Sequence, residues 1–262
     1  MPYALITGAS KGIGREIAIS LAKRKYNLLL IARTEKLLVD LAKELQEKYK
    51  VEVFYNAIDL SSADAAEDII TWCNKGGYDI SVLINNAGYG LNGAFEKLPL
   101  DEQLNMMWLN MSTLVQFTHL SLPLLKRHSG KSYILNIAST AAYQAVPYLA
   151  VYSATKAFVL SFSRALKLEM KGSNVSVTCL SPGGTDTHFM ERAGMEGSKK
   201  IMKQAKKFNM PADEVAEFGV KAMLSRKSEV IPGFSNKITA FSNRLLPKSV
   251  VEAVAKGIYS PE

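Results

Sequence analysis

The sequence predicts an α/β fold in which about seven parallel strands form one doubly wound sheet between two layers of helices. Three observations lead to this prediction. Short apolar runs rich in β-forming residues alternate with longer runs whose apolar residues recur at helical spacing. The short runs are nearly continuous in Val, Ile and Leu, as in strands that helices cover on both faces. A glycine-rich turn joins the first strand-like run to the first helical run.

The expected strands and helices alternate along the chain. The apolar, β-rich runs are residues 3–7, 27–32, 51–57, 80–84, 132–138, 175–180 and 229–231. Helical spacing of apolar residues is found at 13–24, 35–49, 62–74, 100–126, 151–171 and 212–224. Repetition of strand, helix and strand requires parallel strands with right-handed crossovers. No repeat or low-complexity linker divides the chain, so we expect a single domain over residues 1–262.

One irregular stretch, residues 183–210, interrupts this alternation. Excursions of that length are often lids, and we expect a mobile substrate lid at about residues 185–210, with a flexible surface loop as the simpler alternative. The net charge is +8, and the densest basic run lies here: Lys199, Lys200, Lys203, Lys206 and Lys207. We favour a solvated helix face for these lysines, and an electrostatic funnel for an anionic substrate or carrier is the alternative. No nucleic-acid-binding module accompanies the charge.

Composition limits the class of protein. With 262 residues, 48% hydrophobic and 21% charged, the chain is of ordinary globular composition and large enough for one core. The first residues run directly into an apolar strand, so we expect no secretory signal. Polar residues interrupt the long apolar runs, so we expect a cytoplasmic protein without a transmembrane segment. Cys73, Cys179 and three histidines without ligand spacing predict neither a disulfide framework nor a metal site.

A proton-transfer site is predicted from Ser139, Tyr152 and Lys156. Residues four apart on a helix share a face, so Tyr152 and Lys156 are expected side by side on a helix that continues through Glu169. An ammonium at ~4 Å, with an effective dielectric of ~20, supplies about 4 kcal/mol and lowers the pKa of a phenol by about three units. Tyr152 is then a general acid, with Ser139 holding the substrate oxygen. Taken alone, the Tyr-Lys pair also fits a solvated helix face.

The glycine turn after the first strand predicts a dinucleotide site. Its sequence, Thr7-Gly-Ala-Ser-Lys-Gly-Ile-Gly14, has the spacing Gly-x-x-x-Gly-x-Gly and leads directly into a helix. Glycines allow a tight backbone path and close approach of a pyrophosphate, whose charge is favoured at a helix N-terminus. A tight connection without a ligand is the alternative. The cofactor-binding residues expected here are Gly8, Ser10, Lys11, Gly12, Ile13 and Gly14.

The end of the second strand predicts which dinucleotide binds. An enzyme that uses NAD usually places an acid there for the ribose 2′-hydroxyl, whereas this chain has Arg33. Arg33 and Lys11 offer cationic donors to a 2′-phosphate. We therefore expect NADP(H) in preference to NAD(H), and a solvated Arg33 beside a permissive site is the alternative.

With these residues in hand, the chain resembles the short-chain dehydrogenase/reductase (SDR) family over nearly its whole length. The resemblance is carried by the glycine turn, the proton-transfer residues, and four further motifs that follow strands or lie in helices: Asp59-Leu60, Asn85-Asn86-Ala87-Gly88, Asn110, and Pro182-Gly183 with Thr187. It implies a Rossmann fold with the ligands at the carboxyl ends of the strands.

The resemblance also implies roles for residues outside the glycine turn. It places the adenine against Asp59 and Leu60, and the ribose on the segment Asn86, Ala87 and Gly88. It implies that the carboxamide lies against Pro182, Gly183, Thr185 and Thr187. In the family pattern Asn110 holds the water of a proton relay, while Lys156 also hydrogen-bonds the nicotinamide ribose.

These expectations combine into a hypothesis for function. The chain is expected to be an NADPH-dependent oxidoreductase that reduces an apolar ketone or 3-ketoacyl carbonyl to an alcohol, with Tyr152 as general acid. The candidate pocket segments are mostly apolar or aromatic: residues 89–91, 141–149 and 189–190. A non-catalytic dinucleotide-binding protein, or a protein that docks to a membrane or a carrier, is the alternative on the same fold.

The C-terminal extension at about residues 234–262 departs from many family members, and this puts the usual tetramer in doubt. Ile238, Phe241 and Leu245 share one helical side, which could cap the pocket, form an interface or make weak peripheral contact with a membrane. We prefer packing in the core. A homodimer is expected, and one candidate face is the Met- and aromatic-rich helix containing Met106, Met107, Trp108, Met111 and Phe117.

Overall fold

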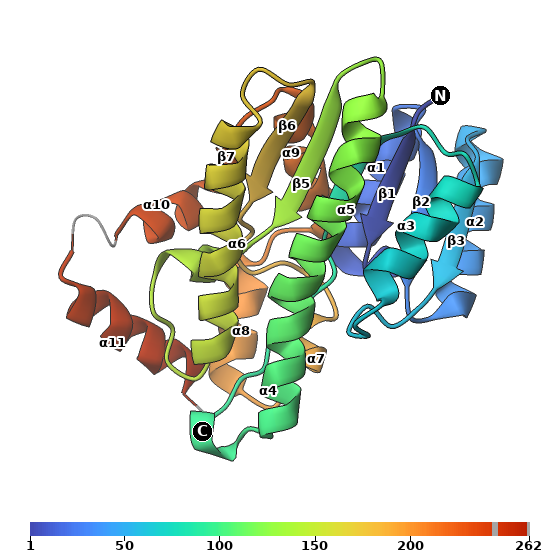
Figure 1. Cartoon of the computed structure of the whole chain (residues 1–262). Helices are drawn as coiled ribbons and strands as arrows, with labels where there is room; N and C mark the ends of the chain where they lie inside the picture. Colours follow the sequence, from blue (N-terminus) through green and yellow to red (C-terminus); the bar gives the residue numbers. More distant parts are fainter. Residues whose placement is uncertain (243–245, 261–262) are drawn as a thin grey trace.

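A computed structural model, which describes residues 1–242 and 246–260, confirms the predicted fold class (Figure 1). In the described residues, seven parallel strands lie in the order β3-β2-β1-β4-β5-β6-β7. The strands are β1 (Tyr3–Thr7), β2 (Asn27–Ala32), β3 (Val53–Ala57), β4 (Ile80–Asn85), β5 (Ser132–Ile137), β6 (Val175–Leu180) and β7 (Glu229–Val230). The strand order reverses between β1 and β4, and ligands of open α/β sheets bind at such a point, beyond the carboxyl ends of the strands.

Helices cover both faces of this sheet, and others gather near the carboxyl ends of the strands (Figure 1). α1 (Gly12–Lys23), α2 (Glu35–Tyr49) and α9 (Ala212–Leu224) pack on one face. α3 (Ala65–Lys75), α5 (Thr113–Arg127) and α6 (Ala150–Glu169) pack on the other. The remaining helices are α4 (Leu100–Met107), α7 (Phe189–Arg192), α8 (Lys199–Phe208), α10 (Phe234–Ser242) and α11 (Lys248–Tyr259), with 3-10 turns at Phe95–Lys97 and Thr140–Tyr143.

The sheet is buried on both sides because successive strand residues point to opposite faces. On β1, Ile6 belongs to the core beneath α1, α2 and α9, whereas Leu5 belongs to the core beneath α3 and α5. Both side chains are completely buried. Each such burial contributes about 2 kcal/mol to folding, which accounts for the unbroken apolar strands in the sequence.

The helix expected over residues 100–126 forms in three parts. A π-helical turn, η2 (Trp108–Ser112), joins α4 to α5. A π turn adds a residue to the helical repeat, and here it carries the fully buried Asn110. Within this helix the core contains Met106, whereas Trp108 is exposed, so the Met-rich run is only partly buried.

The stretch expected to be irregular contains two helices, α7 and α8, so the expected irregularity was wrong. The solvated helix face favoured for its lysines is confirmed, since these lysines lie exposed on α8. Its ends are fastened together, since Asp186 N donates to Met210 O and Met210 N donates to Gly184 O, both at 3.0 Å. The Ser198 hydroxyl accepts from Ile201 N and caps α8. Among the described residues, Ile201 is the one buried side chain of α8. The apolar spacing that indicates a helix is therefore weak in this part of the sequence.

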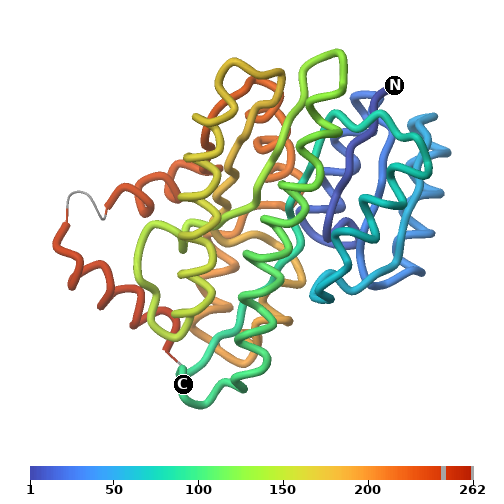
Figure 2. The backbone as a smooth tube through the Cα atoms, viewed as in Figure 1, coloured from blue at the N-terminus to red at the C-terminus, as the bar shows by residue number. Residues whose placement is uncertain are grey.

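The preference for core packing of the C-terminal extension was wrong for α10. Ile238 is 56% exposed and Phe241 is 44% exposed. Leu245 lies outside the described residues. α11 behaves differently, since Val251 and Ala255 on its inner face are buried. The backbone trace shows α11 ending near the segment after β4 (Figure 2), where Asn92 Nδ2 donates to Tyr259 O at 3.2 Å.

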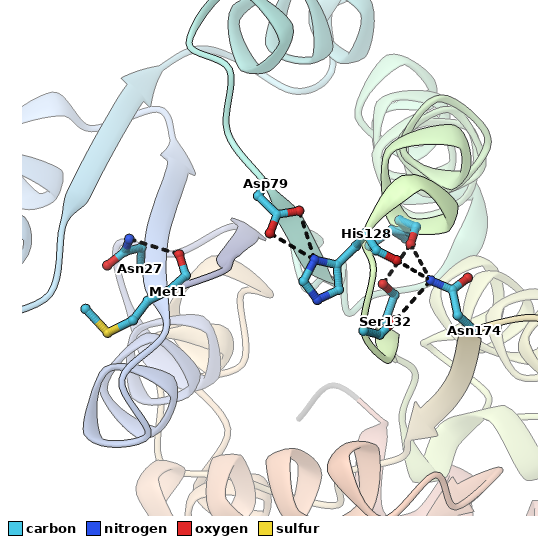
Figure 3. A network of polar contacts seen from close by, with 8 residues as sticks. Met1, Asn27, Asp79, His128, Ser132 and Asn174 are labelled. Carbon is cyan, nitrogen blue, oxygen red and sulfur yellow. Dashed lines mark hydrogen bonds and ion pairs between the residues drawn. The ribbon is translucent and has the colours of Figure 1, made fainter.

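Polar contacts stabilise the end of the sheet at which the strands begin (Figure 3). His128 Nδ1 pairs with Asp79 Oδ1 at 2.8 Å, and Asn174 Nδ2 donates to His128 O at 3.0 Å. Asn27 Nδ2 donates to Met1 O at 3.2 Å. His128 therefore makes a structural hydrogen bond to Asp79, remote from the carboxyl ends of the strands.

Within the described residues, no helix is long and apolar enough to cross a membrane. No group of three or more His, Cys, Asp or Glu side chains there is placed to hold a metal ion. Cys73 and Cys179 are free thiols buried in α3 and β6.

Candidate active site

The glycine turn between β1 and α1 is held against the turn that follows β4. Gly8 and Gly12 have φ angles of +66° and +55°, which favour glycine. Asn86 Nδ2 donates to Thr7 O at 3.1 Å and to Gly8 O at 3.0 Å. The Thr7 hydroxyl accepts from Asn86 N at 3.0 Å and from Ala87 N at 3.1 Å. The two turns therefore form one rigid cradle at the point where the strand order reverses.

The cradle fits the pyrophosphate of a dinucleotide. Lys11 is the N-cap of α1 and its side chain makes no capping hydrogen bond. The first N–H groups of α1 therefore remain suited to an anion, whose charge the helix dipole also favours. A side chain at Gly12 would lie 3.1 Å from Thr187 Cγ2, so this glycine and Thr187 face each other across the cradle.

Replacing Gly14 is expected to disrupt the cradle. A Cβ there would lie well inside van der Waals contact with Gly8 O and Asn86 Nδ2. We expect Gly14→Ala to lower the free energy of unfolding by about 2 kcal/mol and to weaken dinucleotide binding. Urea unfolding measures the first effect. Gly197→Ala is the control, because nothing lies within 4 Å of the Cβ it adds; equal stability of the two variants would contradict the rigid cradle.

Arg33 and Asp59 lie near each other where β2 and β3 end. A hydrogen bond from the Ser61 backbone N–H is the main cause that lowers the pKa of Asp59, and the charge of Arg33 contributes further. Asp59 Oδ1 accepts from Ser61 N at 2.9 Å. Both Arg33 and Asp59 are exposed, as is Lys11. The structure thus places a cation and a carboxylate together at the predicted adenosine end of the site.

The three proton-transfer residues come together at the other end of the site. Tyr152 and Lys156 both lie in α6 and are buried. Lys156 Nζ lies 5.8 Å from the centroid of the Tyr152 ring and donates to Ile137 O at 3.0 Å. Ser139 follows β5 and hydrogen-bonds Tyr152, while its hydroxyl accepts from Ala141 N at 3.1 Å. The sequence spacing therefore predicted this grouping correctly.

The electrostatics of the pair differ from the expectation. Burial raises the pKa of Tyr152 to about 12; the Ser139 hydrogen bond opposes this rise and Tyr259 adds to it. Burial also lowers the pKa of Lys156 to about 8. The expected lowering of the phenol pKa was wrong for this structure, because desolvation of the buried phenol outweighs the other effects on its pKa.

The buried ammonium of Lys156 costs stability, which a substitution can measure. Its pKa is about 8 in the fold and 10.5 ordinarily, so the unfolded chain binds more protons between these values and stability rises with pH there. We expect Lys156→Met to raise the free energy of unfolding by about 2 kcal/mol at pH 7. The gain should shrink as the pH approaches 10.5. Urea titrations at several pH values test this, with exposed Lys171→Met as control; a gain that is independent of pH would contradict it.

Asn110 fixes the segment beside Lys156. Its Nδ2 donates to Tyr89 O at 2.9 Å and to Thr155 Oγ1 at 3.1 Å, and its Oδ1 accepts from Tyr89 N at 3.1 Å. A side chain at Gly88 would lie 2.7 Å from Asn110 Oδ1 and 3.6 Å from Lys156 Nζ, so the two groups flank Gly88. Both amide hydrogens are used in these contacts, and one lone pair of Oδ1 remains for a further donor.

The remaining predicted cofactor residues lie around the same cradle or in the segment after β6. Thr185 Oγ1 donates to Gly183 O at 3.0 Å, and Pro182 O accepts from Thr140 N at 2.8 Å. Leu60 is buried and its carbonyl accepts from Thr113 Oγ1 at 2.8 Å. Ile13 is partly buried in the core beneath α1 and Ser10 is partly exposed in the turn.

An apolar wall surrounds the Tyr152 side chain. The rings of Tyr152 and Phe189 are 5.3 Å apart, and a Cβ at Gly90 would lie 2.7 Å from Phe189 Cζ. The same cluster includes residues of the expected pocket segments: Tyr89, Leu91, Val146, Leu149 and Met190. Adjacent His188 is exposed, as expected.

Two contacts at this site could not be identified from the sequence, which indicated only that the C-terminal extension could cap the pocket. Ala255 and Tyr259 of α11 pack in the cluster around Tyr152. The Thr155 hydroxyl orients the Asn110 amide. An apolar spacing over residues 248–259 was the only available signal for α11, and it gives no indication of where a helix docks.

Comparison with known proteins agrees with this geometry. The family model described as short chain dehydrogenase matches residues 2–196. A very-long-chain 3-oxoacyl-CoA reductase from Laccaria bicolor is 37% identical over 182 residues, which are 68% of this chain and 53% of that relative. A protein of the same name from Vanderwaltozyma polyspora is 32% identical over 98% of this chain and 73% of that relative. The chain spans about half the length of several curated relatives that it matches.

A solved structure extends the likeness to nearly the whole chain. The short-chain dehydrogenase from Sphingobium yanoikuyae, in complex with NADPH, matches with a TM-score of 0.82 and 29% identity, covering 94% of each chain. The likeness therefore extends over more of the chain than the family model, which covers residues 2–196.

Proposed function

This chain belongs to the short-chain dehydrogenase/reductase family of oxidoreductases, and on that premise we propose that it reduces the carbonyl of a 3-oxoacyl thioester with NADPH. One observation carries the proposal. Tyr152, Ser139 and Lys156 lie together beside an apolar cluster, which includes Tyr152, and beside the cradle that fits a dinucleotide. A proton donor is thus held next to the binding site of a hydride donor.

The chain's own residues perform the proton chemistry of this reaction. Bound NADPH supplies the hydride. Ser139 hydrogen-bonds the carbonyl oxygen and Tyr152 donates its proton to that oxygen as negative charge develops. The raised pKa keeps the phenol protonated at neutral pH. Lys156 is still largely protonated at pH 7, and its charge stabilises the phenolate that remains. Asn110 orients the segment and offers an acceptor to the water that returns the proton.

We assign NADP(H) rather than NAD(H) from the groups at the adenosine end. Arg33 and Lys11 are the cations available to a 2′-phosphate, and both are exposed. Asp59, together with Leu60, is assigned to the adenine. The cradle residues hold the pyrophosphate and the ribose: Gly8, Ser10, Gly12, Ile13, Gly14, Asn86, Ala87 and Gly88. Pro182, Gly183, Thr185 and Thr187 hold the carboxamide. The NADPH named with the Sphingobium yanoikuyae structure supports this choice.

The substrate class follows from the pocket and from the relatives. The wall around Tyr152 is apolar and includes Phe189 and Leu149, which suits an acyl chain. The relatives from Laccaria bicolor and Vanderwaltozyma polyspora are named very-long-chain 3-oxoacyl-CoA reductases. Residues 185–210 serve as the substrate lid, since Phe189 and Ile201 of this segment close the wall. The single domain, the homodimer and the cytoplasmic location stay predictions.

A screen of carbonyl substrates tests the proposal. We expect NADPH oxidation with 3-oxoacyl-CoA esters at a kcat/KM at least about tenfold above that with steroid ketones or short ketones, because the apolar wall binds the acyl chain. Mass spectrometry of the 3-hydroxy product is the second readout. If only a steroid or a small ketone supports NADPH oxidation, that substrate class replaces the thioester assignment. If the protein binds NADPH but oxidises it with none of the carbonyl compounds, the proposal is contradicted.

A further inference from the structure

A cavity of about 320 Å³ lies between α8 and α11, outside the apolar wall around Tyr152. It is lined by Lys200, Lys203, Gln204, Lys207, Phe208, Gly257 and Ile258. Among these described lining residues there is no carboxylate. A volume of this size accommodates part of a small ligand rather than the face of a protein partner.

The three lysines form one row because of their spacing. Residues three and four apart on a helix are neighbours, so Lys200, Lys203 and Lys207 lie on the same side of α8. All three are exposed, and Lys207 Nζ lies 5.2 Å from the centroid of the Phe208 ring. Ammonium groups in a row, with an aromatic ring beside them, attract a ligand that carries several phosphates and a base.

The same two helices connect this cavity to the catalytic tyrosine. Ile201 of α8 and Ala255 of α11 pack in the cluster that contains Tyr152. Ile258 lines the cavity, and the next residue, Tyr259, lies close enough to Tyr152 to raise the pKa of the latter. The seam between α8 and α11 thus runs from the lysine row to the site of proton transfer.

We propose that the lysine row binds the phosphate groups of coenzyme A, while the thioester arm passes along the seam between α8 and α11 to Tyr152. This inference rests on the proposed function and names the part of the substrate that the apolar wall cannot bind. Coenzyme A carries several phosphates at one end of a long neutral arm, which matches a cationic outer cavity and an apolar inner wall. In this proposal the exposed lysines of α8 bind part of the substrate, in addition to keeping the helix surface soluble.

Direct binding tests the site without turnover. Titration calorimetry with free coenzyme A compares wild type with the double variant Lys203→Gln/Lys207→Gln. We expect the Kd to rise about tenfold, as two charge-assisted contacts are lost at an exposed site. The matched control is Lys199→Gln/Lys206→Gln, which removes the same charge from the same helix outside the cavity lining. If coenzyme A binding is weakened equally in the two variants, or is unchanged in both, the lysine row is not the binding site of the phosphates.

Kinetics separate this site from the proposed function. With a 3-oxoacyl-CoA, the cavity variant should show a KM about tenfold higher at unchanged kcat, whereas the N-acetylcysteamine thioester of the same acid, which lacks phosphates, should react equally with both proteins. Lower activity of the cavity variant with both thioesters would overturn the proposal. A third substrate, the same acyl group on a carrier protein, is tested as well, and lower activity with that substrate alone would also overturn it. If coenzyme A binding depends on the lysines but neither thioester is reduced, the site stands and the proposed function fails.

Discussion

Replacement of Tyr152 by Phe is expected to lower kcat about a thousandfold and to leave NADPH binding within about twofold of wild type. In the proposed reaction the hydroxyl is the proton donor, so its removal affects the step at the carbonyl oxygen. The ring, which packs 5.3 Å from Phe189, is retained and keeps the pocket wall in place. Steady-state kinetics with a 3-oxoacyl-CoA and fluorescence titration with NADPH measure the two quantities.

Tyr133→Phe is the matched control for that experiment. Tyr133 is as buried as Tyr152 but lies in β5 within the core beneath α1 and α9. The Tyr133→Phe variant loses a tyrosine hydroxyl that lies outside the site, so the kcat of this variant should equal that of wild type. A Tyr152→Phe enzyme with undiminished kcat would remove Tyr152 from the role of general acid.

Replacement of Arg33 by Asp is expected to raise the KM for NADPH about a hundredfold and to make NADH the better cofactor. The guanidinium is lost as a donor to the 2′-phosphate, and the new carboxylate repels that dianion. The same carboxylate can accept from the 2′-hydroxyl of NADH. Comparison of kcat/KM for the two cofactors, in wild type and variant, gives the change in preference.

The control for cofactor choice is Lys43→Asp, the same charge reversal on the exposed face of α2. Lys43→Asp should change the KM for NADPH and the KM for NADH by no more than about twofold, because the effect of an exposed distant charge is screened. Two results contradict the assignment of NADP(H): a wild-type preference for NADH, or an unaltered preference in Arg33→Asp.

Most of the fold could be predicted from the sequence because local patterns and global topology agree in this chain. Continuous apolar strands such as residues 27–32 are buried on both faces, and alternation with helices dictates the parallel order. The grouping of Tyr152 with Lys156 follows from helical periodicity alone. Tyr152 meets Ser139 because β5 and α6 place both at the same edge of the sheet.

Other features depend on contacts between distant segments and could not be predicted. The π turn at Asn110 exists where a buried amide bonds Tyr89 and Thr155, and hydrophobic spacing does not report that pairing. The pKa of Tyr152 depends on burial by the surrounding wall, including Tyr259, so a calculation from the Tyr-Lys spacing gave the wrong direction. The bounds of α8 could not be predicted, since its lysines outnumber its apolar residues and indicate only a solvated helix face.

In the proposed reaction, hydride passes from NADPH to a carbonyl carbon while Tyr152 protonates the oxygen. Isotope transfer tests it most directly, with 4-deuterated NADPH of defined stereochemistry and a 3-oxoacyl-CoA. We expect deuterium from one face of the cofactor to appear at C3 of the 3-hydroxyacyl product in wild type, and Tyr152→Phe to form this product about a thousandfold more slowly. Oxidation of NADPH with no deuterium in a hydroxy product, from either face of the cofactor, would contradict it.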